Sequence, residues 1–201
     1  MKKFLLLVAL FLINQLHPYE NKIDLLSLYK DLHANPELSY QEFETSEKLA
    51  NLLESIGYEV TRNVGGNGVV ALLKNGNGKN IMFRADMDGL PVEEKTGARY
   101  ASQKKVTNLD GEEVFTMHAC GHDVHMTVLI GVAEYLFENK SEWQGNLILV
   151  LEPAEEVSGG ARNMIKDGLF TRFPRPDYNL AFHVNAGMPT GKVGFLPGWA
   201  M

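Results

Sequence analysis

The chain has 201 residues, about the size of one domain, which excludes a large multidomain assembly. Apolar residues make up 45% of it and charged residues 22%, a balance typical of globular domains and unlike disordered or collagen-like sequences. The formal net charge is −6, and no run of lysine and arginine forms a basic stripe, which argues against nucleic acid as a partner. Because Cys120 is the single cysteine, an intrachain disulfide is impossible.

Residues 1–20 have the layout of a secretory signal peptide, in which Lys2 and Lys3 precede an apolar run at 4–13. This run is too short for a membrane-spanning helix, which needs about 20 apolar residues, so we expect no stable membrane span. We therefore expect a secreted or periplasmic protein. Residues 15–19 lack the small residues that signal peptidase prefers, so the alternative is an apolar N-terminal segment packed on a cytoplasmic domain.

Helical periodicity predicts a first helix from Lys22 to His33, which Asn35-Pro36 closes. A second helix is predicted to begin at a capping box formed by Ser39 to Glu42 and to end at Gly57. Three strands are then predicted, at 58–61, 68–73 and 80–85. Asn75-Gly76 is typical of a hairpin turn joining the last two.

After a long loop, four more elements are predicted: a helix at 123–138, a strand at 147–151, a helix at 160–166 and a strand at 180–184. Strands that alternate with helices favour an α/β fold, a mostly parallel mixed sheet with helices on both faces. Ligands of such sheets bind beyond the carboxyl ends of the strands, so functional residues are expected there.

The segment from Met117 to His125 contains three histidines, a cysteine and an aspartate. Cys120 and His122 are ligand types suited to zinc and its neighbours in the first transition row, and the glycine between them allows a tight bend. A buried cysteine beside a core histidine is the structural alternative for this pair alone. A Cys120 nucleophile with His122 as base is a further alternative, although the sequence identifies no third group to orient it.

Further candidates follow other strands. Glu155 and Glu156 come just after an apolar strand and a proline, where one carboxylate can ligate a metal and the other can act as general base. His183 ends the last predicted strand. Asp86 and Asp88 point to the same side of their strand and can fix the tautomer of a ligand histidine. Ligand types that arrive from several strand ends favour a metal site.

Five segments in this order resemble the M20 metallopeptidase family, most closely its amidohydrolase branch of hippurate, N-acyl-amino-acid and auxin-conjugate hydrolases. They are residues 31–39 (DLHANPELS), 84–92 (RADMDGLPV), 117–123 (MHACGHD), 152–156 (EPAEE) and 182–184 (FHV). The resemblance covers about residues 25–201. It implies a catalytic domain that holds two divalent transition metals, drawn from zinc, manganese, cobalt or nickel.

The resemblance also implies roles for individual residues. Cys120 is similar to the bridging ligand of the two metals, and further ligands are matched by His122, Glu156 and His183. Glu155 matches the general base, and Asp88 matches the aspartate that supports the metal centre. The implied reaction is hydrolysis of the amide of an N-acyl amino acid or a small peptide by metal-activated water.

Members of this family are nearly twice as long. The resemblance therefore implies that residues 22–201 are the N-terminal part of the catalytic domain, incomplete at its C-terminus, without the lid and dimerisation domain or the last ligand histidine. A homodimer is then expected only in a full-length form. Glu152 stands where the branch usually has glutamine, and we expect it to add negative charge near the metals. The alternative to a truncated enzyme is a non-catalytic metal-binding remnant.

Overall fold

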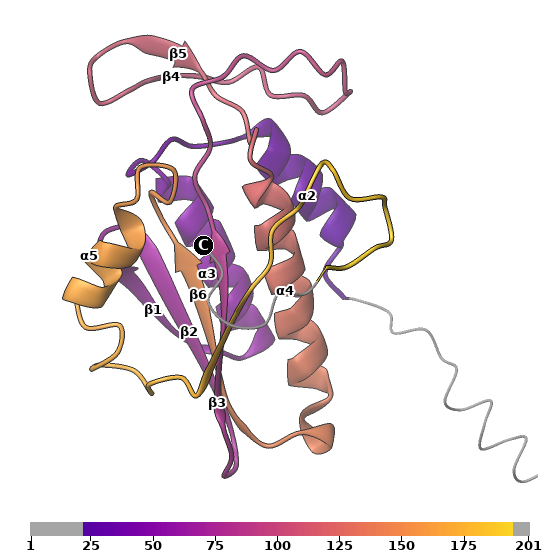
Figure 1. Cartoon of the computed structure of the whole chain (residues 1–201), viewed down its shortest axis with the longest axis vertical. Coiled ribbons are helices and arrows are strands. Elements are labelled where there is room, and N and C mark those ends of the chain that lie inside the picture. Colours follow the sequence, from indigo (N-terminus) through magenta and orange to yellow (C-terminus); the bar gives the residue numbers. More distant parts are fainter. Residues whose placement is uncertain (1–21, 195–201) are drawn as a thin grey trace, which may run out of the picture.

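The computed structural model describes residues 22–194 and shows a five-stranded sheet between two layers of helix (Figure 1). Its helices are α2 (Leu25–Ala34), α3 (Phe43–Ile56), α4 (His122–Glu138) and α5 (Gly160–Lys166), with a 3₁₀ turn at Lys140–Glu142. Its strands are β1 (Glu59–Val64), β2 (Gly68–Asn75), β3 (Asn80–Asp86), β4 (Lys105–Thr107), β5 (Glu113–Phe115), β6 (Gly145–Glu152) and β7 (Tyr178–Ala181). The predicted signal segment at 1–20 lies outside the described residues.

The order of the main sheet is β1-β2-β6-β3-β7. Strand β6 pairs antiparallel with β2 and parallel with β3, and β3 also pairs parallel with β7, whereas β1 and β2 are antiparallel. The predicted mixed sheet is thus confirmed, with two of its four described pairings parallel. Helices cover both faces, as predicted. None of the helices within residues 22–194 is long and apolar enough to cross a membrane.

Two apolar clusters hold these layers together. The larger one packs α2, α3 and α4 on one face of the sheet, around fully buried residues such as Leu49, Leu129 and Leu149. The smaller one packs α5 on the other face, where Met164 covers Val70 and Ile148. Alternate residues of β6 enter opposite clusters, which explains why this strand is apolar along most of its length.

The predicted hairpin between β2 and β3 is wrong. The chain does turn at Gly76, whose φ is +76°, but β2 and β3 are not neighbours because β6 lies between them. Strand β6 is buried on both faces and therefore takes the central position, and each of the two flanking strands pairs with it. A turn sequence such as Asn75-Gly76 predicts that the chain reverses direction. It does not predict whether the two strands that it joins pair with each other or with a third strand between them.

Two other predictions need correction. Helix α3 begins at Phe43, and Glu42 at its N-terminus makes no capping hydrogen bond, so the predicted capping box is absent. The long loop at 89–117 contains a small hairpin of β4 and β5, which projects from the body of the molecule (Figure 1). Its strands are three residues each and contain no buried residue, and they are too short for the alternation that would predict them.

Candidate metal centre

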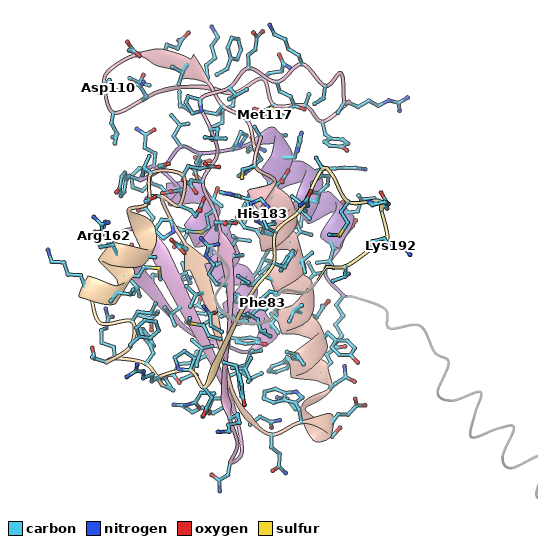
Figure 2. All side chains as sticks on the ribbon, viewed as in Figure 1. Phe83, Asp110, Met117, Arg162, His183 and Lys192 are labelled. Carbon is cyan, nitrogen blue, oxygen red and sulfur yellow. The ribbon has the colours of Figure 1, made fainter. Side chains whose placement is uncertain are left out.

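The predicted site residues gather at the carboxyl end of the main sheet. Asp86 is the last residue of β3, Glu155 and Glu156 follow β6, and His183 lies two residues beyond the end of β7. The N-terminus of α4 brings His122 to the same place. Figure 2 shows His183 at this end of the sheet, well away from Asp110 at the tip of the β4–β5 hairpin. The prediction that His183 ends a strand is therefore wrong by two residues, but its place beside the other candidates is as expected.

His122 lies at the centre of the cluster and is fully buried. Its Nδ1 atom is 3.4 Å from Asp88 Oδ1, and its Nε2 atom is 3.7 Å from a carboxylate oxygen of each of three residues: Asp86, Glu155 and Glu156. Burial lowers the pKa of His122, but the nearby carboxylate of Asp88 and the charges of the surrounding carboxylates outweigh burial and raise it. The carboxylates around His122 therefore favour a positive charge at the centre of the cluster.

Cys120 and His183 form the second part of the cluster. The Sγ atom of Cys120 is 3.3 Å from Nε2 of His183. The other ring nitrogen of His183, Nδ1, donates to the carbonyl oxygen of Val184 at 2.7 Å, which leaves the lone pair of Nε2 directed at the sulfur. Gly121 allows this arrangement because its φ is +82° and because a Cβ there would meet the Val184 side chain at 2.4 Å.

His125 lies beside this cluster, but both of its ring nitrogens are already engaged. Nδ1 donates to Asp86 at 2.6 Å, and Nε2 accepts from the backbone N–H of Val184 at 3.1 Å. Burial raises the pKa of Asp86, but the hydrogen bond from His125 and the charges of His122 and Arg84 lower it to about 2. His125 therefore fixes the segment before His183 and has no free nitrogen for a metal.

The donor set fits a divalent transition metal. Within this cluster, buried atoms of three residues find no hydrogen-bond partner: Asp88 Oδ1, both ring nitrogens of His122, and Glu156 Oε1. Elsewhere among residues 22–194, the same holds for both ring nitrogens of His118 and for Glu134 Oε2. Such atoms are costly to bury unless something satisfies them. Three groups have ligand atoms that lie within 4.8 Å of one another: Cys120–His122–His183, Asp88–His122–Glu155 and Asp86–His122–His125. The last is the weakest candidate, because both ring nitrogens of His125 are engaged. Sulfur, imidazole and carboxylate together suit borderline metals.

The electrostatics separate the candidates further. Burial, followed by the charge of Asp86, raises the pKa of Glu155, which favours a group that can take up a proton. Burial and the charges of Glu156, Glu155 and Asp86 raise the pKa of Cys120 to about 12. A thiol held in its protonated form is a poor nucleophile, so these surroundings argue against the Cys120 nucleophile that the sequence left open.

The negative charge that Glu152 is expected to add near the metals is paired with Arg84, and its effect on the metals stays a prediction. The Glu152 carboxylate accepts from Arg84 Nε at 2.6 Å and from the backbone N–H of Ala161 at 2.9 Å. The Glu152 carboxylate therefore binds an arginine and the first turn of α5. It is not one of the carboxylates that lie within 4 Å of the His122 ring nitrogens.

His33 is a further buried histidine near the site, and the sequence did not predict a role for it. His33, at the end of α2, contacts Asp123 through Nδ1 at 2.7 Å and Glu94 through Nε2 at 3.0 Å. Since both partners are carboxylates, both ring nitrogens are placed to donate. This bridge ties α2 and the 89–102 segment to the N-terminal turn of α4, next to His122. Its only signal in the sequence is its place in the 31–39 motif.

A cavity of about 330 Å³ opens beside Cys120 and His183. Its lining combines metal-ligand types with apolar and aromatic side chains: Tyr29, His33, His118, Ala119, Cys120, Gly121, Asp123, Val124, His183, Val184 and Ala186. A small molecule bound there would reach the cluster directly.

Comparison with known proteins supports the resemblance. The sequence profile of peptidase family M20/M25/M40 matches residues 82–198, more than half of the chain. The hippurate hydrolase of Campylobacter jejuni is 45% identical over 162 residues, which cover 80% of this chain and 38% of the relative. IAA-amino acid hydrolase ILR1-like 2 of Arabidopsis thaliana is 34% identical, over 87% of this chain and 37% of the relative. The chain thus spans about 40% of the length of such curated relatives.

A solved structure with the same fold is the Bacillus subtilis YXEP protein, described as a dinuclear metal binding peptidase from the M20 family. It is 34% identical and superimposes with a TM-score of 0.72, over 82% of this chain and 44% of that one. The fold predicted from the sequence, an α/β layer like that of the M20 catalytic domain, is confirmed.

Proposed function

Because the chain belongs to peptidase family M20/M25/M40, we propose that it hydrolyses, as part of a larger enzyme, the amide bond of N-acyl amino acids or small peptides. The observation that supports this most directly is the buried cluster around His122, in which partnerless ligand atoms lie beside the two adjacent glutamates. Two similar proteins are named hippurate hydrolase and IAA-amino acid hydrolase, which supports an acylated amino acid as substrate.

Four residues would hold the metal: Cys120, His122, Glu156 and His183. Zinc, manganese, cobalt and nickel all suit this donor set, and the M20 neighbour with two metals supports a pair of ions. When bound, such an ion would lower the pKa of a coordinated water and polarise the carbonyl of the substrate. Asp88 would receive the Nδ1–H of His122 and so keep its Nε2 directed at the cluster.

Glu155 would be the general base. Its carboxylate is more exposed than that of Glu156, at 37% against 20%, so it can meet both water and substrate. Its raised pKa suits a group that takes the proton of the attacking water and passes it to the nitrogen of the leaving amine. The cavity beside Cys120 would receive the acyl group, whose apolar part can contact Val124 and Val184.

Residues 1–20 would direct the chain to the outside of the cell, and residues 22–201 would form the N-terminal part of the catalytic domain. The charged and then apolar pattern of the first segment supports this proposal. Cell fractionation together with N-terminal sequencing tests it. A cytoplasmic chain that keeps Met1 would contradict export.

The metal proposal is tested by elemental analysis of the purified chain and of Cys120→Ala and His122→Ala. We expect at least one divalent transition metal per chain in the parent and a sharp loss in both variants. Glu134→Gln is the matched control, since Glu134 is a buried carboxylate on α4 that lies about 18 Å along the helix from His122. Equal metal content in all four proteins would show that the site is wrongly assigned.

The activity is tested with hippurate and with N-acetylcysteine, the substrates suggested by the names of relatives. We expect hydrolysis that a chelator abolishes and that added metal restores. Turnover that is insensitive to the chelator would contradict the proposal. A chain that binds metal through this cluster and hydrolyses neither substrate, even when a C-terminal half of the family is supplied, would favour the non-catalytic remnant.

A further inference from the structure

The segment that leads into α3 interlocks with the turn that presents Glu155 and Glu156. Ser39 donates to Asp88 Oδ2 at 2.6 Å, and the same oxygen accepts from the backbone N–H of Glu156 at 3.1 Å. The Tyr40 hydroxyl lies against Gly159, where a Cβ would approach it to 1.7 Å. The two segments are more than 100 residues apart in the sequence, yet they fit together closely on the glutamate side of the site.

Glu42 makes the most buried of these contacts. Its side chain is fully buried, and its Oε1 atom accepts from the backbone N–H of Ala154 at 2.7 Å. Its other oxygen, Oε2, accepts from Asn67 Nδ2 at 3.0 Å. Although Glu42 occupies the N-terminal position of α3, its carboxylate makes no bond to that helix. A carboxyl group buried in this way is costly to desolvate, and its hydrogen bonds to two distant segments offset that cost.

Ala154 is an unusual residue for Glu42 to hold. Its φ is +48°, in the left-handed region that residues with a Cβ seldom adopt, and it directly precedes Glu155. Its carbonyl oxygen accepts from Gly159 and Gly160, so the turn closes on itself behind the two glutamates. The bond from Ala154 N–H to Glu42 is the contact that fixes this turn against the rest of the domain at the residue before Glu155. Together with the bond from Glu156 N–H to Asp88, this contact sets the direction in which Glu155 and Glu156 leave the turn.

We propose that Glu42 is a positioning residue, whose buried carboxylate holds the left-handed turn at Ala154 so that Glu155 and Glu156 face His122. This inference rests on the proposed function, because it assigns a purpose to Glu42 only if the two glutamates serve a metal centre. Glu42 touches neither the metal ligands nor the base. Glu42 acts on Glu155 and Glu156 through the backbone N–H of Ala154.

The test is a titration of the metal-free chain with Co²⁺, followed by the ligand-field and thiolate-to-cobalt absorption bands. We expect Glu42→Ala to bind Co²⁺ at least about tenfold more weakly than the parent, with altered ligand-field bands, because Glu156 is no longer held toward His122. Glu42→Gln should bind within about threefold of the parent, since its amide oxygen can still accept from Ala154 N–H. Glu42→Asp should resemble the alanine variant, because it keeps the charge but loses the reach.

Glu134→Ala is the matched control. Glu134 is also a buried carboxylate that accepts from two N–H donors, the backbone amides of Lys22 and Ile23, but it lies at the far end of α4. A merely structural role for Glu42 predicts that the two alanine variants lose thermal stability without a difference in Co²⁺ affinity. The positioning role predicts that only the Glu42 variant loses affinity.

Parent-like Co²⁺ affinity and spectrum in folded Glu42→Ala would overturn the inference. If Glu42→Ala does not fold, parent-like affinity in folded Glu42→Asp would overturn it equally. His122→Ala separates this failure from that of the proposed function. Weak binding in His122→Ala beside parent-like binding in the Glu42 variants would leave the metal centre in place and remove only the role of Glu42. Unchanged binding in His122→Ala would remove both.

Discussion

The guanidinium of Arg84 donates to Glu152 from Nε over 2.6 Å, across the neighbouring parallel strands β3 and β6. The same guanidinium reaches Asp86 from Nη1 at 2.9 Å. Arg84 thus divides its charge between a carboxylate that bonds the first turn of α5 and one that holds His125. The ion pair links the sheet to the elements on either side of the site, and both partners are largely buried.

From this pair we predict that Glu152→Ala lowers the free energy of unfolding by about 2 kcal/mol, because it removes a charged hydrogen bond and leaves the N–H of Ala161 without its acceptor. Glu152→Gln should cost less than about 1 kcal/mol, since the amide oxygen can still accept. Urea unfolding measures both values. Metal content should be the same in both variants as in the parent, because Arg84 offsets the charge of Glu152. A loss of metal in Glu152→Gln would show instead that this negative charge acts on the metal site.

A second prediction concerns the reactivity of Cys120. With a thiol pKa of about 12, the metal-free folded chain should react with iodoacetamide at pH 8 at least about tenfold more slowly than free cysteine. The same chain unfolded in urea should react at the rate of free cysteine. Glu156→Gln should speed the folded reaction, because it removes a charge that opposes the thiolate. Equal rates in the folded and unfolded chain would contradict these electrostatics.

The metal-ligand types were predictable because each one follows a strand or begins a helix, and strand ends meet at one edge of the sheet. Cys120, His122 and Glu156 belong to that class. The role of Glu42 was not predictable from the sequence. A glutamate three residues after a serine and just before a helix has the pattern of a capping box. Its true partner, Ala154, is 112 residues away, and nothing local marks that contact. The position of β6 between β2 and β3 was likewise not predictable, because no local sequence feature marks a pairing between strands that are far apart in the chain.

A third prediction uses the bridge from His33 to Glu94 and Asp123. Burial lowers the pKa of His33, but its hydrogen bonds to the two carboxylates outweigh burial and raise it. A histidine whose pKa is raised by folding contributes stability that is complete below its unfolded pKa of about 6.5 and is lost as the pH rises through the folded value. Glu94, whose pKa is lowered, remains ionised over that range.

We therefore expect the metal-free parent to exceed His33→Gln in stability by more at pH 6 than at pH 9, as measured by urea unfolding. The neighbouring His118 has the opposite tendency, because burial lowers its pKa to about 4. Burial, the main cause of this shift, is common to both proteins, so the contribution of His118 largely cancels in the difference, although the charge of His33 is a lesser cause. A stability gap that is constant or widens between pH 6 and pH 9 would show that His33 is not an imidazolium in the folded chain.

The last prediction separates the two adjacent glutamates. Glu155→Gln should keep Co²⁺ affinity within about threefold of the parent, because it removes a proton acceptor and leaves the proposed ligands in place. Glu156→Gln should weaken binding by at least about tenfold, because it removes the charge of the carboxylate whose Oε1 lies buried and unpartnered beside His122.

Where turnover is measurable, Glu155→Gln should lower it by about 10²–10⁴-fold, the usual contribution of a general base. Titration with Co²⁺ and hydrolysis of hippurate, carried out on the same preparations, distinguish the two roles. Added metal should recover activity in Glu156→Gln, since saturation offsets a weak ligand, whereas no metal concentration should rescue Glu155→Gln. Loss of Co²⁺ in Glu155→Gln together with retention in Glu156→Gln would reverse the assignment of base and ligand.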